Sequence, residues 1–177
     1  SELSVTDALR NFGAEPLRDL VEACFEALGQ VHAAGVVHRA LSPGRVWLGR
    51  SQRVLFSDFF HARIDDMKTL IPIPVDTVAK PFASPESRED SHAATEASDV
   101  FSLAQILAEW LKSEIPADGH NISESDSELM QLLETCRDLD ASSRPTAVRV
   151  VETLRSWRSV FSGGSVGEKT EDTESSE

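Results

Sequence analysis

The stretch from Val36 to Leu48, VVHRALSPGRVWL, is the part of this 177-residue chain that most constrains its fold. Upstream of it, apolar residues recur at helical spacing and end at Gly35, which is typical of a helix C-terminus. Downstream, Val46–Leu48 is rich in residues that favour strands. The stretch therefore predicts a loop that carries His38 and Arg39 from a helix to a strand.

Helical spacing of apolar residues recurs along much of the chain. It predicts helices over Thr6–Phe12, Pro16–Gly35, Val100–Leu111, Leu129–Cys136 and Ala147–Phe161. In the third of these, apolar side chains cover nearly the whole circumference, so we expect it to form the buried centre of the domain. Ser98 or Asp99 is expected to cap its start, because a side-chain oxygen there can accept from free backbone N–H groups.

The strand signals are few. Val46–Leu48 and Val54–Phe56 are short β-rich runs separated by five polar or small residues, which predicts one small hairpin. Residues 64–86 hold four prolines and no clear period, so a long loop is expected there. Residues 113–126 are polar and predict a surface loop or a weak helix. The fold class is thus mainly α, a helical bundle around a buried central helix with one small β-hairpin.

Composition and charge exclude several functional classes. A net charge of −13 argues against sequence-independent nucleic-acid binding and against anionic membranes. No run approaches the ~18 apolar residues of a membrane span. Cys24 and Cys136 lie in helical patterns and are interpreted as reduced structural thiols, which favours a cytoplasmic location. We expect residues 1–161 to form one folded domain and residues 162–177 to be a disordered acidic tail.

The sequence around the opening stretch resembles the C-terminal lobe of a protein kinase. His38, Arg39 and Leu41 stand where that family has its catalytic loop, H-R-D-L-x-x-x-N. Further motifs follow in the family's order: Ser57–Phe60 is similar to the metal-binding D-F-G segment, Ala83–Glu86 to A-P-E, Ser98–Leu103 to the start of the central F helix, and Asp138–Thr146 to the D-P-x-x-R-P turn. The resemblance covers residues 3–161 and implies that the family's N-terminal lobe is not in this chain.

The catalytic loop departs from the family at the positions that handle the reaction. Ala40 replaces the catalytic Asp, Ser42 the Lys, and Arg45 the metal-binding Asn. Three departures within six residues favour natural degeneracy over an engineered change. We therefore expect a pseudokinase that has no catalytic residue and is not an enzyme.

Arg45 and Asp58 leave the metal question open. Arg45 excludes a metal, points to solvent, or replaces the metal as a phosphate-binding charge. A cation ~5 Å away costs on the order of 1–3 kcal/mol per unit of ion charge at intermediate dielectric. Asp58 is a weak candidate for binding a metal or cofactor, and its alternative role is that of a turn residue. The histidines and cysteines do not show zinc spacing, and no cofactor is expected.

Other residues of the resemblance have scaffold roles. It implies that Glu86 and Arg144 form a buried ion pair and that Asp99 anchors the backbone of the catalytic loop. It also implies that Arg39 meets the segment over residues 64–86. Three acids there, Asp65, Asp66 and Asp76, are expected partners for it without phosphorylation.

Three functions remain open from the sequence. The first is a protein-interaction or allosteric regulatory module within a larger protein or complex, with a linked or separate active kinase or signalling protein as partner. Its expected interaction surfaces are the loop over residues 64–86 and residues 113–126. The second is a nucleotide-binding module completed by an N-terminal lobe outside this chain. The third is a residually active, unconventional phosphotransferase.

Overall fold

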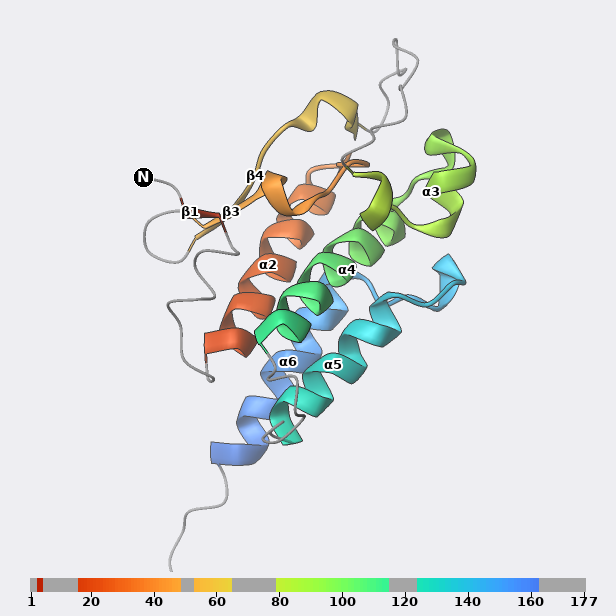
Figure 1. The fold of residues 1–177 in the computed structure, drawn as a ribbon. Helices are drawn as coiled ribbons and strands as arrows, with labels where there is room; N and C mark the ends of the chain where they lie inside the picture. The colour runs from red at the N-terminus through yellow and green to blue at the C-terminus, as the bar shows by residue number, and fades with distance from the viewer. Residues whose placement is uncertain (1–2, 5–15, 49–52, 65–78, 115–123, 163–177) are drawn as a thin grey trace, which may run out of the picture.

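The computed structural model describes residues 3–4, 16–48, 53–64, 79–114 and 124–162. Four long helices make up most of this part: α2 (Pro16–Ala33), α4 (Glu96–Glu114), α5 (Glu124–Cys136) and α6 (Ala147–Ser162). A short helix, α3 (Pro85–Glu89), precedes α4. Figure 1 shows the four long helices running side by side, with the strands to one side of them.

Helix α2 begins and ends where its sequence favours. Pro16 occupies the first helical position, where its missing N–H group costs nothing. Gly35 follows the helix with a positive φ of 71°, a conformation that is strained for other residues, and donates from its N–H to the carbonyl of His32. This turn directs the chain out of the helix and into the loop that follows.

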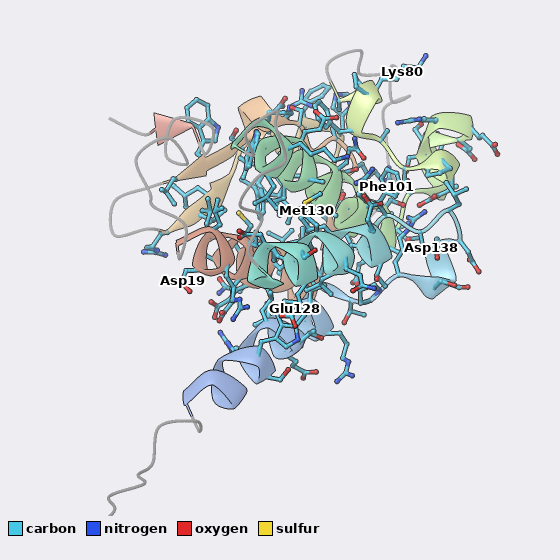
Figure 2. All side chains as sticks on the ribbon, turned by 60° about the horizontal axis from the view of Figure 1, so that its bottom comes forward. Asp19, Lys80, Phe101, Glu128, Met130 and Asp138 are labelled. Atoms are coloured by element: carbon cyan, nitrogen blue, oxygen red, sulfur yellow. The ribbon has the colours of Figure 1, made fainter. Side chains whose placement is uncertain are left out.

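Helix α4 is the centre of the core. Leu103, Ala104 and Ile106 on it are fully buried, and α2 and α5 both pack against it. Helix α6 packs mainly on α2, so the core is shared by all four long helices. In Figure 2, Phe101 and Met130 lie at the helices α4 and α5, whereas Lys80 points away from the body of the molecule. Burial of most of α4 gives the rest of the lobe a rigid element to pack against.

Short strands form two small antiparallel sheets. The hairpin of β3 (Val46–Leu48) and β4 (Val54–Phe56) pairs Val46 with Phe56, and β1 (Leu3–Ser4) adds to its β3 edge. A second sheet pairs β2 (Val36–Val37) with β5 (Arg63–Ile64). The two sheets flank the loop of residues 38–45, so they fix both of its ends.

The predicted fold class is confirmed: the chain is mainly helical, with a buried central helix and the predicted hairpin. Strands β1, β2 and β5 were not predicted, because two-residue strands carry no readable period. Part of the predicted loop over 64–86 is also ordered, since α3 begins at Pro85. The predicted helix over residues 6–12 and the acidic tail from residue 163 lie outside the described residues, as does most of the predicted loop over 113–126.

The predicted cap of α4 is wrong. The helix begins at Glu96, two residues before Ser98. Ser98 instead lies in the first turn, where its Oγ accepts a hydrogen bond from the backbone N–H of Thr95 and donates to Glu86. Both Ser98 and Asp99 are suitable N-caps by residue type, but their side chains are engaged with distant segments.

Candidate functional site

Asp99 holds the loop of residues 38–45 against the central helix. Its carboxylate accepts hydrogen bonds from the backbone N–H groups of His38 at 2.7 Å and Arg39 at 2.8 Å. The side chain of His32 on α2 lies 3.2 Å from the same carboxylate. Asp99 is only 1% exposed, so these contacts are shielded from water. The predicted anchoring role of Asp99 is therefore confirmed.

His38 joins the loop to the segment that follows the hairpin. Its Nε2 lies 3.0 Å from the carbonyl oxygen of Ser57, and its ring packs on Phe59 with 4.6 Å between centroids. Burial lowers the pKa of His38 below its ordinary value, although the nearby charge of Asp99 acts in the opposite direction. His38 is thus a packing residue that connects the loop to the segment after the hairpin.

Within the described residues, the guanidinium of Arg39 is only partly paired. The residue adopts a positive φ of 68°, and its Nε and Nη1 atoms are buried without a hydrogen-bond partner in the described part of the chain. Burial lowers the pKa of Arg39, and the charge of Arg63 lowers it further. Asp65, Asp66 and Asp76, the acids expected to pair with it, lie outside the described residues.

Ala40 and Ser42 occupy the positions of the family's Asp and Lys. Ala40 is 3% exposed, and its methyl group offers no acceptor for a proton. Ser42 is 1% exposed, and its Oγ has no hydrogen-bond partner among the residues that the structure describes. The backbone carbonyls do serve the loop, because Ala40 accepts from the Arg45 side chain and Ser42 from the Arg45 N–H. Both residues shape the loop through their backbones.

Arg45 and Asp58 are brought together by the hairpin. Val46 pairs with Phe56 in the hairpin. The next pair along the two strands is Arg45 and Ser57, and the N–H of Ser57 donates to the carbonyl of Arg45. Asp58 comes next and adopts a left-handed conformation with φ of 61°. Its Oδ2 lies 2.6 Å from Nη2 of Arg45, whose side chain is 14% exposed. The alternative in which Arg45 points to solvent is therefore wrong, and Asp58 directly precedes a short 3-10 helix at Phe59–His61.

Glu86 and Arg144 form the predicted ion pair. Arg144 donates from Nη1 at 2.7 Å and from Nη2 at 3.0 Å to the two oxygens of Glu86. Burial disfavours the charge of Glu86, but the hydrogen bonds from Arg144, Ser98 and Ser84 hold its pKa at about 2. A cavity of about 420 Å³ lies beside this pair and is lined by Val37, Arg63, Ala97 and Arg144 among others. Its lining includes none of the altered loop positions.

Sequence reasoning missed two contacts that support the site. Trp47 on β3 donates from its indole Nε1 to Ser57 Oγ at 2.9 Å, and His32 lies against Asp99. Trp47 is a polar-tipped aromatic in a half-buried strand, which usually finds a partner. His32 lies among the apolar residues of its helix. Its spacing therefore predicted only that it packs in the core, and gave no sign of the contact with Asp99.

The described residues contain no group of three or more His, Cys, Asp or Glu side chains that could hold a metal ion. Cys24 and Cys136 are free and buried there, as expected for structural thiols. Burial raises the pKa of each thiol to about 12, so neither is a nucleophile near neutral pH. No helix in the described ranges is long and apolar enough to cross a membrane.

Comparisons with known proteins extend over most of the chain. The family model described as the protein kinase domain matches residues 3–156. The serine/threonine-protein kinase AfsK of Streptomyces coelicolor is 32% identical over 147 residues, which are 75% of this chain and 18% of that protein. AfsK of Streptomyces griseus is 29% identical over 143 residues, again 18% of its length. The serine/threonine-protein kinase PknA of Mycobacterium tuberculosis is 30% identical over 118 residues, 27% of its length.

These comparisons correct one prediction from the sequence. Ala40, Ser42 and Arg45 led us to expect a protein that is not an enzyme. That prediction is wrong, because a match to the protein kinase domain and relatives named as kinases point to an enzyme. It rested on three side chains, whereas phosphoryl transfer depends mainly on positioning and electrostatic stabilisation, which other residues can also supply.

Proposed function

Because this chain belongs to the protein kinase family, we propose that it acts, within a larger protein of that family, as a protein-interaction and allosteric regulatory module. The observation that carries the proposal is the division of roles among the family's residues. Asp99, Glu86 and Arg144 keep their fold-holding contacts, whereas Ala40 has no acceptor where the family has its base. Such a lobe retains a defined shape, which we propose serves as a surface for binding other proteins.

Exposed apolar side chains near the altered loop support an interaction role. Phe60, which replaces the Gly of D-F-G, is 69% exposed, and Phe59 and Ile64 are 42% and 45% exposed. Three large apolar groups within six residues form a denser group than the single exposed residues of an ordinary surface. They adjoin the segment over residues 65–78, part of the predicted interaction surface, which lies outside the described residues.

The partner we propose is a protein. A linked or separate active kinase or another signalling protein fits the family, and the chain spans only 18% of the AfsK relatives, so a linked partner is part of the proposal. The net charge of −13 disfavours nucleic acids and anionic membranes as ligands. Two free, buried cysteines support a cytoplasmic location for this module.

Phosphate transfer to serine or threonine is the second candidate function. The names of the relatives favour it, since each is a serine/threonine-protein kinase. In this case a group other than residue 40 must accept the proton of the substrate hydroxyl. Asp58 would remain the family's acidic group beside the transferred phosphate. A related alternative is a module that binds a nucleotide, together with residues outside this chain, without transferring its phosphate.

The test compares two variants of the full-length protein, expressed in source cells from which the gene has been deleted. Asp58→Asn removes the charge at the altered site, and Phe60→Ser removes the most exposed aromatic group. Phosphoserine and phosphothreonine in cell proteins are then quantified by mass spectrometry. A regulatory module predicts that Phe60→Ser shifts the pattern toward that of the deletion and that Asp58→Asn does not.

Val148→Ser is the matched control for the aromatic change. Val148 lies on α6 and is 56% exposed, so its replacement also removes a surface apolar group. It should leave the phosphorylation pattern unchanged. If Asp58→Asn reproduces the deletion pattern while Phe60→Ser behaves as wild type, phosphate transfer is favoured and the regulatory proposal fails.

A further inference from the structure

The position of Arg45 conflicts with the metal site that the protein kinase family implies. In that family the site takes a carboxylate from D-F-G and an amide oxygen from the catalytic loop. Here the loop position holds a guanidinium, which has five donors and no acceptor. Mg²⁺ requires several oxygen ligands in octahedral arrangement, so a guanidinium cannot serve as one of them.

The carboxylate that remains is already bound. Asp58 Oδ2 lies 2.6 Å from Arg45 Nη2, which is within reach of a charge-assisted hydrogen bond. A metal ion at Asp58 would have to separate this pair or accept a permanent positive charge beside it. Both changes disfavour the ion, and the effect is larger for a divalent ion than for a monovalent one.

Arg45 is also held in place from its other side. Its Nη1 donates to the carbonyl of Ala40 at 2.7 Å, and its backbone carbonyl accepts from Ser57 within the hairpin frame. The side chain is 14% exposed, whereas Asp58 is 43% exposed. Exposed ion pairs are weak because two mobile side chains must be ordered, but the guanidinium here is already ordered by the loop.

We propose that Arg45 is the built-in cation of this site: it occupies the Asp58 carboxylate, joins the catalytic loop to the turn after the hairpin, and excludes divalent metal. The inference concerns the chemistry of Arg45 and Asp58 alone. It is therefore independent of the regulatory function proposed above, which requires no metal ion at this site.

Arg45→Asn restores the family's oxygen ligand beside Asp58 and removes the competing charge. The full-length variant is titrated with MnCl₂, and binding is followed by the relaxation of water protons and by thermal unfolding. We expect wild type to show no saturable binding and the variant to gain it. The double variant Arg45→Asn/Asp58→Asn is the matched control and should lose what the single variant gains.

Two further proteins keep the inference testable if Arg45→Asn does not fold. Arg45→Lys retains the positive charge and should exclude Mn²⁺ as wild type does. Wild type and Asp58→Asn are compared directly in the same titration. Saturable Mn²⁺ binding by wild type that Asp58→Asn abolishes would overturn the proposal. A folded Arg45→Asn variant without Mn²⁺ binding would overturn it as well.

Discussion

Arg144 joins three segments of the lobe through one side chain. Besides its two bonds to Glu86, it donates from Nε to the carbonyl of Asp138 at 2.7 Å and from Nη1 to that of Ala97 at 3.0 Å. Its guanidinium carbon lies 4.9 Å from the centre of the Phe101 ring. The planar guanidinium can donate to several acceptors at once in a fixed geometry, whereas the ammonium group of a lysine cannot.

Replacing Arg144 by Ala should therefore destabilise the lobe. The change removes the ion-pair partner of Glu86 and the donor to the carbonyls of Asp138 and Ala97, at a cost on the order of 3 kcal/mol. We expect the melting temperature to fall by roughly 6–12 °C in differential scanning calorimetry. Arg149→Ala is the control, because Arg149 makes an ion pair of the same 2.7 Å length with Glu152 on the exposed surface. Equal effects of the two changes would contradict the scaffold role.

Glu86 makes stability depend on acid pH. Its pKa is about 2 in the folded lobe, against an ordinary value of 4.5. A lowered folded pKa means that the carboxylate contributes its full stability above about pH 4.5 and loses it as pH falls toward 2. Glu86→Gln should flatten the decrease of unfolding free energy across this window, measured by urea denaturation. An unchanged slope would show that Glu86 is not the group responsible.

The buried thiols predict a chemical test of the core. The pKa of both Cys24 and Cys136 is raised to about 12 by burial, and thiols react as thiolates. In the folded lobe neither cysteine should react with 5,5′-dithiobis(2-nitrobenzoic acid) at pH 8, whereas both should react in guanidinium chloride. Mass spectrometry of the two cysteine peptides assigns the sites. Rapid modification of either cysteine in the native lobe would contradict the packing described.

At the scale of elements, the lobe depends on α4. Leu103 on this helix is fully buried, so Leu103→Ala removes packing that the surrounding helices cannot fully close over. We expect a loss of about 2–5 kcal/mol in the free energy of unfolding, measured by urea denaturation. Leu139→Ala is the matched control, because the same change at a side chain 79% exposed should cost little. A loss below 1 kcal/mol, about the cost of a mild core change, would contradict the central place of α4.

Sequence pattern predicted the long helices because their apolar residues repeat a helical period over several turns. It predicted the hairpin because two β-rich runs flank five polar or small residues. The start of α4 was harder, since Ser98 and Asp99 look like caps but serve partners far away in the chain, Glu86 and the backbone of His38. Motif order predicted that Ala40, Ser42 and Arg45 share one loop, and in the structure all three lie between β2 and β3. The direction of Arg45 was not predictable, because it depends on the hairpin register that brings Asp58 beside it.

At the scale of the whole molecule, the lobe keeps the contacts that hold its fold and changes the side chains that face the reaction. The match to the protein kinase domain runs from residue 3 to residue 156, so the altered loop lies within an otherwise continuous family fold. Since the chain covers 18% of the AfsK relatives, the functional tests belong on the full-length protein. The ion pair of Arg45 and Asp58 connects the loop of residues 38–45 to the segment that follows the hairpin.

The most direct measurement of this account is a calorimetric titration of the full-length protein with ATP, once with Mg²⁺ and once with EDTA. If Arg45 serves as the cation of the site, ATP should bind at least as tightly with EDTA as with Mg²⁺, because the complex of ATP with Mg²⁺ would have to release the ion before binding beside Arg45. Tight, saturable binding that requires Mg²⁺ and is lost in Asp58→Asn would contradict the account.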